Sequence, residues 1–475
     1  MTPINDLKDL FQSWAGEPAE VIDEMAAHGS SRRYFRIKGS TKQAVGVHNE
    51  DLKENIAFLS FSKHFLNCNL NVPKIYSQEL DKHIYLEEDL GDETLFSFMS
   101  AVREKEGFSE NILNAYEAVI DELPKFQVLA NEGLDYSICY PRHSFDRQSM
   151  MWDLNYFKYY FLKLAGIPFN EQELEDDFQT FTDFLLSTPR DFFLYRDFQS
   201  RNIMLKDGSV YFIDYQGGRK GALQYDLASL LYDAKADIPN EIRVKLLERY
   251  IKQLGKYTSV NKEKFIQYYY GYVFIRIMQA LGAYGFRGFY ERKEHFLKSV
   301  PYAVQNLEWL LHNTELPVEL RALTKAWNSL VRSSFLRQFG DVKLSMTVRI
   351  QSFSYKRGAP LDEKGHGGGF VFDCRLLPNP GRYEEYKQQT GNDAEVIEFL
   401  QREKEVSEFL ENVYKIAGQA VKNYQQRNFT DLLIAFGCTG GQHRSVYCAN
   451  KAAEFLKNKF DVNVEVRHRE QEMKE

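Results

Sequence analysis

The feature that most constrains the fold of this chain is a set of polar residues placed between short apolar strands. Residues 191–195 and 210–213 are strand-like, and Gly208 supplies a turn just before the second strand. Asp197 and Asn202 lie five residues apart in the loop after the first strand, and Asp214 follows the second. This order of strand, loop, hairpin and strand predicts that the three polar side chains meet at one place.

Two carboxylates and an amide at this spacing suit the transfer of a phosphoryl group. Asp-x-x-x-x-Asn is the spacing of a kinase catalytic loop, in which the aspartate accepts the proton of the attacking hydroxyl. Asn202 and Asp214 offer the hard oxygen ligands that Mg²⁺ prefers. An isolated Asp and Asn would be explained equally well by a capped turn, but the complete order of elements favours a Mg-ATP-dependent phosphotransferase centre.

The hydrophobic patterns around this loop predict two lobes followed by a separate domain. The pattern is mainly β over residues 1–91 and mainly helical over residues 92–337, whereas strands and helices alternate over residues 343–475. The expected helices of the first part are 5–27 and 51–67, and its expected strands are 33–37, 43–48 and 83–86. The predicted fold class is an α+β protein-kinase-like bilobal domain followed by a separate α/β domain.

Composition narrows the class of protein. The 475 residues are 44% apolar and 15% aromatic, as in a folded globular chain rather than a disordered one. A net charge of −7 gives no indication of bulk nucleic-acid binding. Five cysteines without a Cys-x-x-Cys pair argue against a disulfide framework or a zinc site. No signal peptide and no membrane-length apolar run is found, so we expect a cytoplasmic protein with no membrane partner.

The catalytic segment resembles a known family. The runs Tyr195-Arg196-Asp197, Ile213-Asp214-Tyr215-Gln216 and Tyr225-Asp226-Leu227, together with Asn202, are similar to the aminoglycoside-phosphotransferase/choline-kinase family. Within that family the similarity is closest to the kinases that phosphorylate N-acetylmuramate and N-acetylglucosamine at C1, and it covers roughly residues 10–315. The resemblance implies ATP and Mg²⁺ as cofactors and a small-molecule amino sugar, an N-acetylhexosamine, as the acceptor.

The same resemblance assigns roles to individual residues. Asp197 is expected to be the base, Asn202 and Asp214 to bind Mg²⁺, and Asp226 to cap a helix that begins at Leu227. The expected nucleotide contacts are a turn over the phosphates, formed by Ser30, Ser31 and Arg32, and an adenine-binding hinge that includes Glu87, Glu88 and Leu90.

Three departures from the family pattern stand out. Tyr195 replaces the usual histidine, the nucleotide loop is not Gly-x-Gly-x-x-Gly, and the strand at residues 44–48 has no lysine for the phosphates. Arg33, Arg36 and Lys53 are alternative cations between which the sequence does not choose. A pseudokinase therefore remains an alternative.

A second phosphate-binding site is predicted near the C-terminus. An apolar strand leads into a glycine-rich loop and then a helix, so backbone N–H groups and the helix N-terminus favour an anion. The candidate residues are Cys438, Thr439, Gly440, Gly441, Gln442, His443, Arg444 and Ser445, with Arg375 as a second cation. The spacing from Cys438 to Arg444 is also that of tyrosine phosphatases, although a lone cysteine at a strand end is usually a buried apolar residue.

This part of the chain resembles the C-terminal domain of the RNase adapter protein RapZ over about residues 343–475. The resemblance is carried by residues 352–358, 371–380, 437–447 and 466–469. It implies a phosphorylated amino sugar as ligand and a small RNA as a further partner. Lys356, Arg357 and Arg469 belong to a group of basic residues that would form either an RNA-binding face or one phosphate pocket. The alternative function for the whole chain is a regulatory RNA-binding or metabolite-sensing adapter with a weak or inactive kinase lobe.

Overall fold

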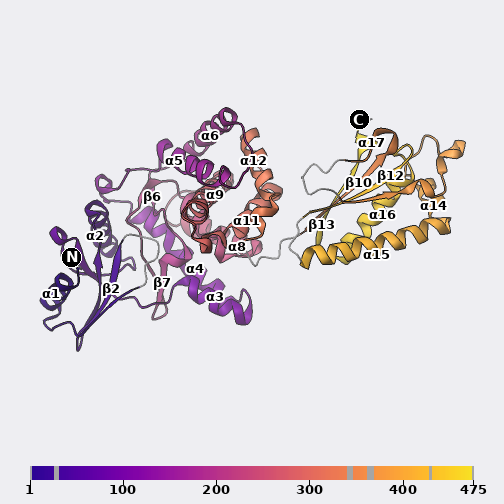
Figure 1. Cartoon of the computed structure of the whole chain (residues 1–475). Coiled ribbons are helices and arrows are strands. Elements are labelled where there is room, and N and C mark those ends of the chain that lie inside the picture. The colour runs from indigo at the N-terminus through magenta and orange to yellow at the C-terminus, as the bar shows by residue number, and fades with distance from the viewer. Residues whose placement is uncertain (1–2, 26–31, 340–345, 361–368, 427–430, 473–475) are drawn as a thin grey trace. The chain divides into compact units, whose positions relative to one another are not determined.

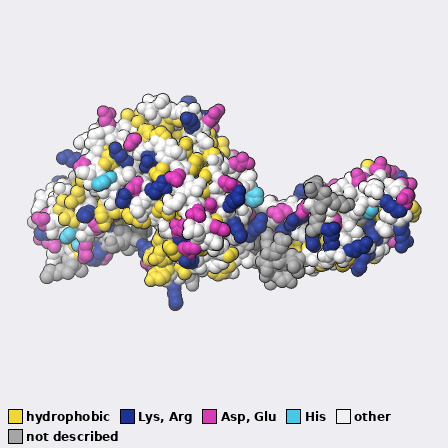
Figure 2. All heavy atoms as spheres, turned by 90° about the horizontal axis from the view of Figure 1, so that it is seen from above, with side chains coloured by type: hydrophobic (Ala, Val, Ile, Leu, Met, Phe, Trp, Pro, Cys, Tyr) yellow, Lys and Arg dark blue, Asp and Glu magenta, His cyan; other side chains and the backbone are white. Residues whose placement is uncertain are grey.

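The structure is a computed structural model that describes residues 3–25, 32–339, 346–360, 369–426 and 431–472. The chain divides into two compact units, Met1–Val331 and Arg332–Glu475, which are described separately here (Figure 1). In the described ranges no helix combines the length and the apolar character needed to cross a membrane. On the face shown in Figure 2, acidic and basic side chains are interspersed rather than separated by sign.

The small lobe of the first unit is a five-stranded antiparallel sheet in the order β1-β2-β3-β5-β4. Its elements are α1 (Ile4–Ala15), β1 (Val21–Glu24), β2 (Arg33–Lys38), β3 (Gln43–His48), α2 (Leu52–Asn67), β4 (Ile75–Glu79) and β5 (Ile84–Glu87). Helix α1 packs Leu7 and Leu10 on the sheet residues Phe35 and Ile37. Helix α1 thereby covers one face of the sheet.

The predicted helix over residues 5–27 is wrong in its second half. Helix α1 ends at Ala15, and strand β1 begins at Val21. Gly16 adopts the left-handed conformation with φ 73°, and its N–H donates to the carbonyl of Gln12. A left-handed glycine ends a helix in this way, which overrides the helical spacing of the apolar residues that follow.

The larger lobe is mainly helical and surrounds two short antiparallel strand pairs, β6 with β9 and β7 with β8. Helix α9 packs against α5, α7 and α11, and most of its apolar residues are buried. Helices α5, α9 and α11 are labelled in Figure 1. The strands are β6 (Phe192–Leu194), β7 (Ile203–Lys206), β8 (Ser209–Phe212) and β9 (Arg219–Gly221). The helices are α3 (Leu95–Glu106), α4 (Glu110–Pro124), α5 (Arg147–Phe157), α6 (Glu171–Leu186), α7 (Gln224–Leu231), α8 (Asn240–Leu254), α9 (Lys262–Gly285), α10 (Glu294–Leu297), α11 (Val300–Asn313) and α12 (Arg321–Val331).

The second unit contains a four-stranded parallel sheet in the order β11-β12-β10-β13. Its elements are α13 (Ser334–Arg337), β10 (Met346–Ser354), β11 (Phe370–Asp373), α14 (Ala394–Arg402), α15 (Lys404–Gln426), β12 (Asp431–Cys438), α16 (Arg444–Lys459), β13 (Val462–His468) and α17 (Arg469–Glu472). Helix α16 packs on the sheet, and α15 packs on α16 (Figure 1). Because Ser354 pairs with Cys438, the carboxyl ends of β10 and β12 lie at the same edge. The predicted separate α/β domain is confirmed.

Candidate functional site

The loop after β6 is held by a buried carboxylate. Asp226 accepts hydrogen bonds from the backbone N–H groups of Tyr195 (2.8 Å) and Arg196 (3.0 Å) and from Nε2 of Gln127 (3.1 Å). Burial raises the pKa of Asp226 to about 7, although the three hydrogen bonds oppose this. Helix α7 begins at Gln224, so the predicted capping of a helix at Leu227 is wrong. Asp226 instead anchors the loop that carries Asp197.

Arg196 fixes the same loop from the other side. Its guanidinium donates to both carboxylate oxygens of Asp153 (2.8 and 2.7 Å) and to the hydroxyl of Tyr225 (2.7 Å). Its backbone has φ 82°, a conformation that residues other than glycine rarely adopt. Such a conformation persists only where the surroundings hold it. Arg196 and Asp226 together therefore fix the backbone immediately before Asp197.

The structure brings Asp197, Asn202 and Asp214 together, as their spacing predicts. The side-chain amide of Asn202 donates to the backbone carbonyl of Asp197 (2.9 Å) and to Oδ2 of Asp214 (3.0 Å). The N–H of Ile213 donates to the carbonyl of Asn202 (3.1 Å). Burial, and then the charge of Asp197, raise the pKa of Asp214 above its usual value. The site thus gathers negative charge at one end of the β7–β8 hairpin.

This donor set fits a divalent cation of the magnesium type. The amide nitrogen of Asn202 donates to the backbone carbonyl of Asp197 and to Oδ2 of Asp214. The amide of Asn202 and the carboxylate of Asp214 therefore lie side by side. A positive ion would relieve the repulsion between the two carboxyl groups. Within the described ranges no three His, Cys, Asp or Glu side chains form a metal-binding group. An ion held here therefore needs further oxygen ligands, such as water or nucleotide phosphates.

The residues predicted to contact the nucleotide phosphates are Ser30, Ser31 and Arg32. Ser30 and Ser31 lie outside the described residues. Arg32 is 3% exposed and pairs with Glu54 of α2, with 3.2 Å between Nη2 and Oε1. Arg32 therefore lies within the lobe, at the start of β2.

The three predicted hinge residues lie at the end of β5. Burial raises the pKa of Glu87 to about 8. Glu88 accepts a hydrogen bond from Nζ of Lys206 on β7 (2.8 Å), and Leu90 is buried. The Glu88–Lys206 pair therefore joins the end of the sheet to the hairpin that precedes Asp214.

The three alternative cations are engaged elsewhere. Arg33 donates to both carboxylate oxygens of Glu24 (2.8 and 2.9 Å). Arg36 pairs with Asp89 and Asp92. The ammonium of Lys53 lies 5.7 Å from the ring centroid of Tyr140.

Two residues that sequence reasoning missed link the lobes of this site. Gln216 Nε2 donates to Oδ1 of Asp214 (2.6 Å) and to Oε1 of Glu54 (3.3 Å). Glu54 lies in the first turn of α2, the helix that follows β3. Glu54 could have been picked out by its place in the first turn of the helix after the third strand, whereas Gln216 was marked only as part of the run 213–216 that carries the family resemblance.

The glycine-rich loop of the second unit connects β12 to α16. Thr439 and Gly440 are exposed, whereas Cys438 is buried and its Sγ lies 3.1 Å from Oγ of Ser445. Gly441 has φ 67°, and an added Cβ would lie 2.9 Å from the backbone nitrogen of Ser354. The exposed residues Thr439 and Gly440, which precede the buried start of α16 at Arg444, are therefore the part of the loop that an anion can reach.

The loop side chains mainly bind the neighbouring backbone. Arg444 Nη1 donates to the carbonyls of Arg375 and Leu377, both at 3.0 Å. A ring nitrogen of His443 lies 2.8 Å from the carbonyl of Tyr386, and Gln442 Nε2 donates to the carbonyl of Gln389 (2.6 Å). Arg375 itself pairs with Asp373 (2.6 Å). Arg444 thus holds the 375–377 segment against the loop.

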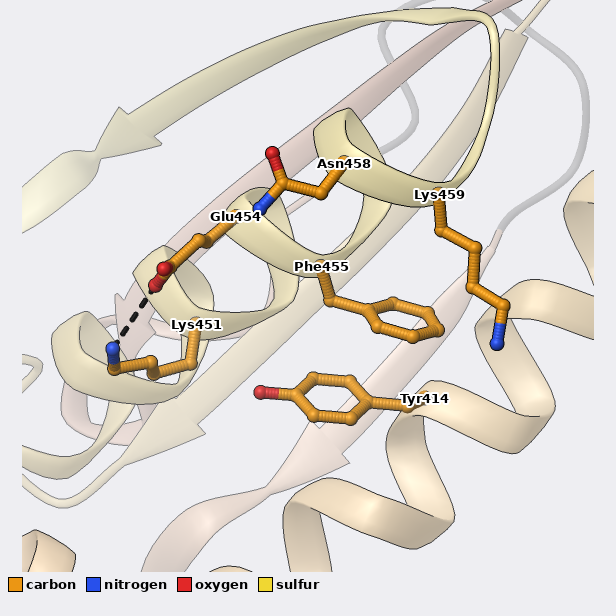
Figure 3. A pocket seen from close by; sticks show the side chains of 6 residues that line it. All are labelled: Tyr414, Lys451, Glu454, Phe455, Asn458 and Lys459. Atoms are coloured by element: carbon orange, nitrogen blue, oxygen red, sulfur yellow. Dashed lines mark hydrogen bonds and ion pairs between the residues drawn. The ribbon is translucent and has the colours of Figure 1, made fainter.

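A surface hollow lies elsewhere in this unit, between α15 and the C-terminal half of α16 (Figure 3). The rings of Tyr414 and Phe455 stack there at 4.3 Å between centroids, and Lys451 pairs with Glu454. Because the glycine-rich loop precedes the other end of α16, this hollow is not part of the loop site.

Comparison with known proteins identifies both units. A family model described as the phosphotransferase enzyme family matches residues 24–262, half of the chain. A second model, described as the RapZ C-terminal domain, matches residues 346–472. The resemblance to the phosphotransferase family at the level of the family, the resemblance to the RapZ C-terminal domain and the predicted fold class are thereby confirmed.

Individual relatives match part of the chain. A nucleotide-binding protein of Thermotoga neapolitana is 39% identical over 143 residues, which cover 30% of this chain and 47% of the relative. A nucleotide-binding protein of Fervidobacterium nodosum is 40% identical over 129 residues, covering 27% and 44%. The chain thus spans just under half the length of these curated relatives.

Among solved structures, choline kinase LicA from Streptococcus pneumoniae aligns with a TM-score of 0.43 and 15% identity. The alignment covers 65% of this chain and 99% of that one. The ADP-bound aminoglycoside phosphotransferase APH(2'')-Ib aligns with a TM-score of 0.42 and 14% identity, covering 63% and 96%.

Proposed function

The chain belongs to the phosphotransferase enzyme family, and from this premise we propose that its first unit is a Mg-ATP-dependent kinase that phosphorylates an N-acetylhexosamine at the anomeric hydroxyl. The observation that carries the proposal is the amide of Asn202, which binds both the Asp197 backbone and the Asp214 carboxylate. This bridge holds a base candidate and a metal-ligand candidate in one rigid group.

Each residue has a stated role in the proposal. Asp197 orients the acceptor hydroxyl and takes its proton. Asn202 and Asp214 would hold Mg²⁺ through their side-chain oxygens, and the ion would supply positive charge for the nucleotide phosphates. Glu87, Glu88 and Leu90 form the adenine-binding hinge, and the family resemblance assigns Ser30, Ser31 and Arg32 to the phosphates.

The choice of acceptor rests on the resemblance of the catalytic segment to anomeric amino-sugar kinases. The test measures ADP release with ATP, Mg²⁺ and a panel of hexoses, N-acetylhexosamines and their 1-O-methyl glycosides. The proposal expects turnover with a free N-acetylhexosamine and none with its methyl glycoside, because the glycoside lacks the anomeric hydroxyl. Equal turnover of both would place the reaction at another hydroxyl.

For the second unit we propose a binding role at the loop before α16. The exposed backbone at Thr439 and Gly440 favours a phosphate group, and a phosphorylated amino sugar is the ligand that the RapZ resemblance suggests. Arg444 contributes positive charge beside it, and Arg375, which pairs with Asp373, would exchange that partner for the phosphate. A small RNA is the second candidate partner, and a regulatory adapter is the second candidate function of the chain.

Filter binding with a structured RNA, with and without glucosamine-6-phosphate, separates these roles. RNA binding that falls steeply with salt supports the adapter function. Absent or salt-insensitive binding removes it and leaves the phosphate site alone. The sugar-phosphate site itself is tested by calorimetric titration with glucosamine-6-phosphate.

A further inference from the structure

The small lobe places its cations on β2 rather than on β3. Phe35 and Ile37 of β2 face α1, so the alternate residues Tyr34 and Arg36 lie on the opposite face. In an antiparallel pair, residues directly opposite each other share a face. The partners of Tyr34 and Arg36 on β3 are Val47 and Val45. The face of β3 that would bear a phosphate-binding lysine is therefore apolar.

Arg32 immediately precedes β2 and is the buried cation of this region. Its side chain is 2% exposed and its Nη2 lies 3.2 Å from Oε1 of Glu54. Its Nη1 lies 3.5 Å from the hydroxyl of Tyr34, and its guanidinium carbon lies 5.7 Å from the ring centroid of Phe58 on α2. Arg32 therefore lies between the sheet and α2.

Arg36, the other arginine on this face, has a different role. It forms a bidentate pair with Asp89 (2.7 and 3.0 Å) and further bonds to Asp92 (3.0 and 2.9 Å). These carboxylates follow β5 and already neutralise its charge. Arg36 thus fixes the chain after the hinge.

Glu54 connects Arg32 to the metal-ligand candidate. Its Oε1 accepts a hydrogen bond from Nε2 of Gln216, and the same nitrogen donates to Oδ1 of Asp214. Its Oε2 accepts from Nδ2 of Asn49 (2.8 Å). Arg32 and Asp214 are thus linked through the side chains of Glu54 and Gln216.

We infer that the Arg32–Glu54 ion pair takes the place of the missing strand lysine and its helix partner, so that Arg32 binds the nucleotide phosphates and Glu54 positions it. The inference rests on the proposed function and adds to it the residue that neutralises the phosphates. An arginine suits this place because its guanidinium binds phosphate oxygens bidentately and stays charged when buried.

Calorimetric titration of the full-length protein with Mg-ADP and with adenosine tests the inference. Adenosine has the base and ribose but no phosphate, so it reports the adenine pocket alone. Arg32→Met is expected to weaken Mg-ADP binding about 10-fold or more and to leave adenosine binding unchanged. Arg32→Lys is expected to retain part of the affinity. The matched control is Arg33→Met, whose pairing with Glu24 lies on the other face of β2 and which is expected to bind both ligands normally.

The outcomes are decisive in each case. Wild-type affinity for Mg-ADP in Arg32→Met would overturn the inference, and so would an equal loss of ADP and adenosine binding, which indicates a structural role. If Arg32→Met does not fold, Glu54→Gln gives the same comparison, because it leaves Arg32 present but no longer held by a charge. Binding of neither ligand by the wild-type protein would contradict the proposed kinase function itself. Inability to phosphorylate any sugar leaves the binding comparison intact.

Discussion

The hydroxyl of Tyr195 donates a 2.6 Å hydrogen bond to the backbone carbonyl of Ile213. One residue of this pair lies two positions before Asp197, and the other directly precedes Asp214. The bond therefore ties the loop of the base candidate to the strand that presents the metal-ligand candidate. The phenol of Tyr195 thus fills a buried position and still finds an acceptor.

Replacing Tyr195 with phenylalanine removes this bond and little else. We expect a loss of about 1 kcal/mol in unfolding free energy, typical of a hydrogen bond. We also expect kcat to fall roughly 10-fold, because Asp197 and Asp214 lose a fixed separation, while KM for ATP stays the same. Steady-state kinetics and urea unfolding measure both quantities. An unchanged kcat would show that the Tyr195–Ile213 bond does not position the site.

Removing the buried acceptor at Asp226 has a larger effect on stability. In Asp226→Ala, the backbone N–H groups of Tyr195 and Arg196 lose their acceptor, and we expect a loss of about 2–4 kcal/mol. The left-handed conformation of Arg196 is then no longer held, so kcat falls as well. Denaturant unfolding measures the loss, with Glu132→Ala as an exposed acidic control. Equal stability of the two variants would rule out the anchoring role.

Two neighbouring glycines differ in what a side chain would meet. A Cβ at Gly217 would lie 3.7 Å from Oδ2 of Asp197, whereas a Cβ at Gly218 would lie 2.4 Å from the ring of Phe193. Gly217→Leu is therefore expected to fold and to raise KM for the acceptor, because its side chain fills space beside the base. Gly218→Ala is expected to lower the thermal unfolding midpoint by several degrees. An unchanged KM in Gly217→Leu together with a raised KM in Gly218→Ala would place the acceptor away from Gly217.

The carboxyl of Glu87 makes stability depend on pH. Burial raises its pKa from 4.5 to about 8, and the charge of Arg32 opposes this. The folded state thus binds the proton more tightly, so this stabilisation is complete below about pH 4.5 and is lost as pH rises through 8. Glu87→Gln cannot titrate and should gain stability over wild type by at most about 1.4 kcal/mol per pH unit in that window. Urea unfolding at pH 5, 6.5 and 8 measures the gain; a constant difference would contradict the buried carboxyl.

In the first unit the sequence predicted strands β2, β3, β5, β6 and β8 and the meeting of Asp197, Asn202 and Asp214, because these depend on local spacing, whereas β1 was taken for helix. The strand–loop–hairpin order leaves few ways to place them. The parallel second domain was also predictable, since its short apolar strands alternate with amphipathic helices. The end of α1 was not predicted, because Gly16 ends the helix in a left-handed conformation although the helical spacing of apolar residues continues beyond it.

Contacts between side chains that lie far apart in the sequence could not be predicted from it. Glu54 and Arg32 lie 22 positions apart, and their pairing depends on which face of β2 turns toward α2. Arg444 looks like a phosphate ligand by type, yet in the fold its guanidinium is bound by the carbonyls of Arg375 and Leu377. The type of a residue decides which interactions its side chain can form. The register of the sheet decides which partner lies close enough to form them.

The most direct test compares ADP release by wild type and Asp197→Ala with ATP, Mg²⁺ and an N-acetylhexosamine. The account predicts turnover by the wild type and a loss of about 10²- to 10⁴-fold in kcat for the variant, because the acceptor hydroxyl loses its general base. Mg-ADP affinity should change little. Equal turnover by both proteins, or no turnover by either across the sugar panel, would contradict the assignment of Asp197 as the base of a sugar kinase.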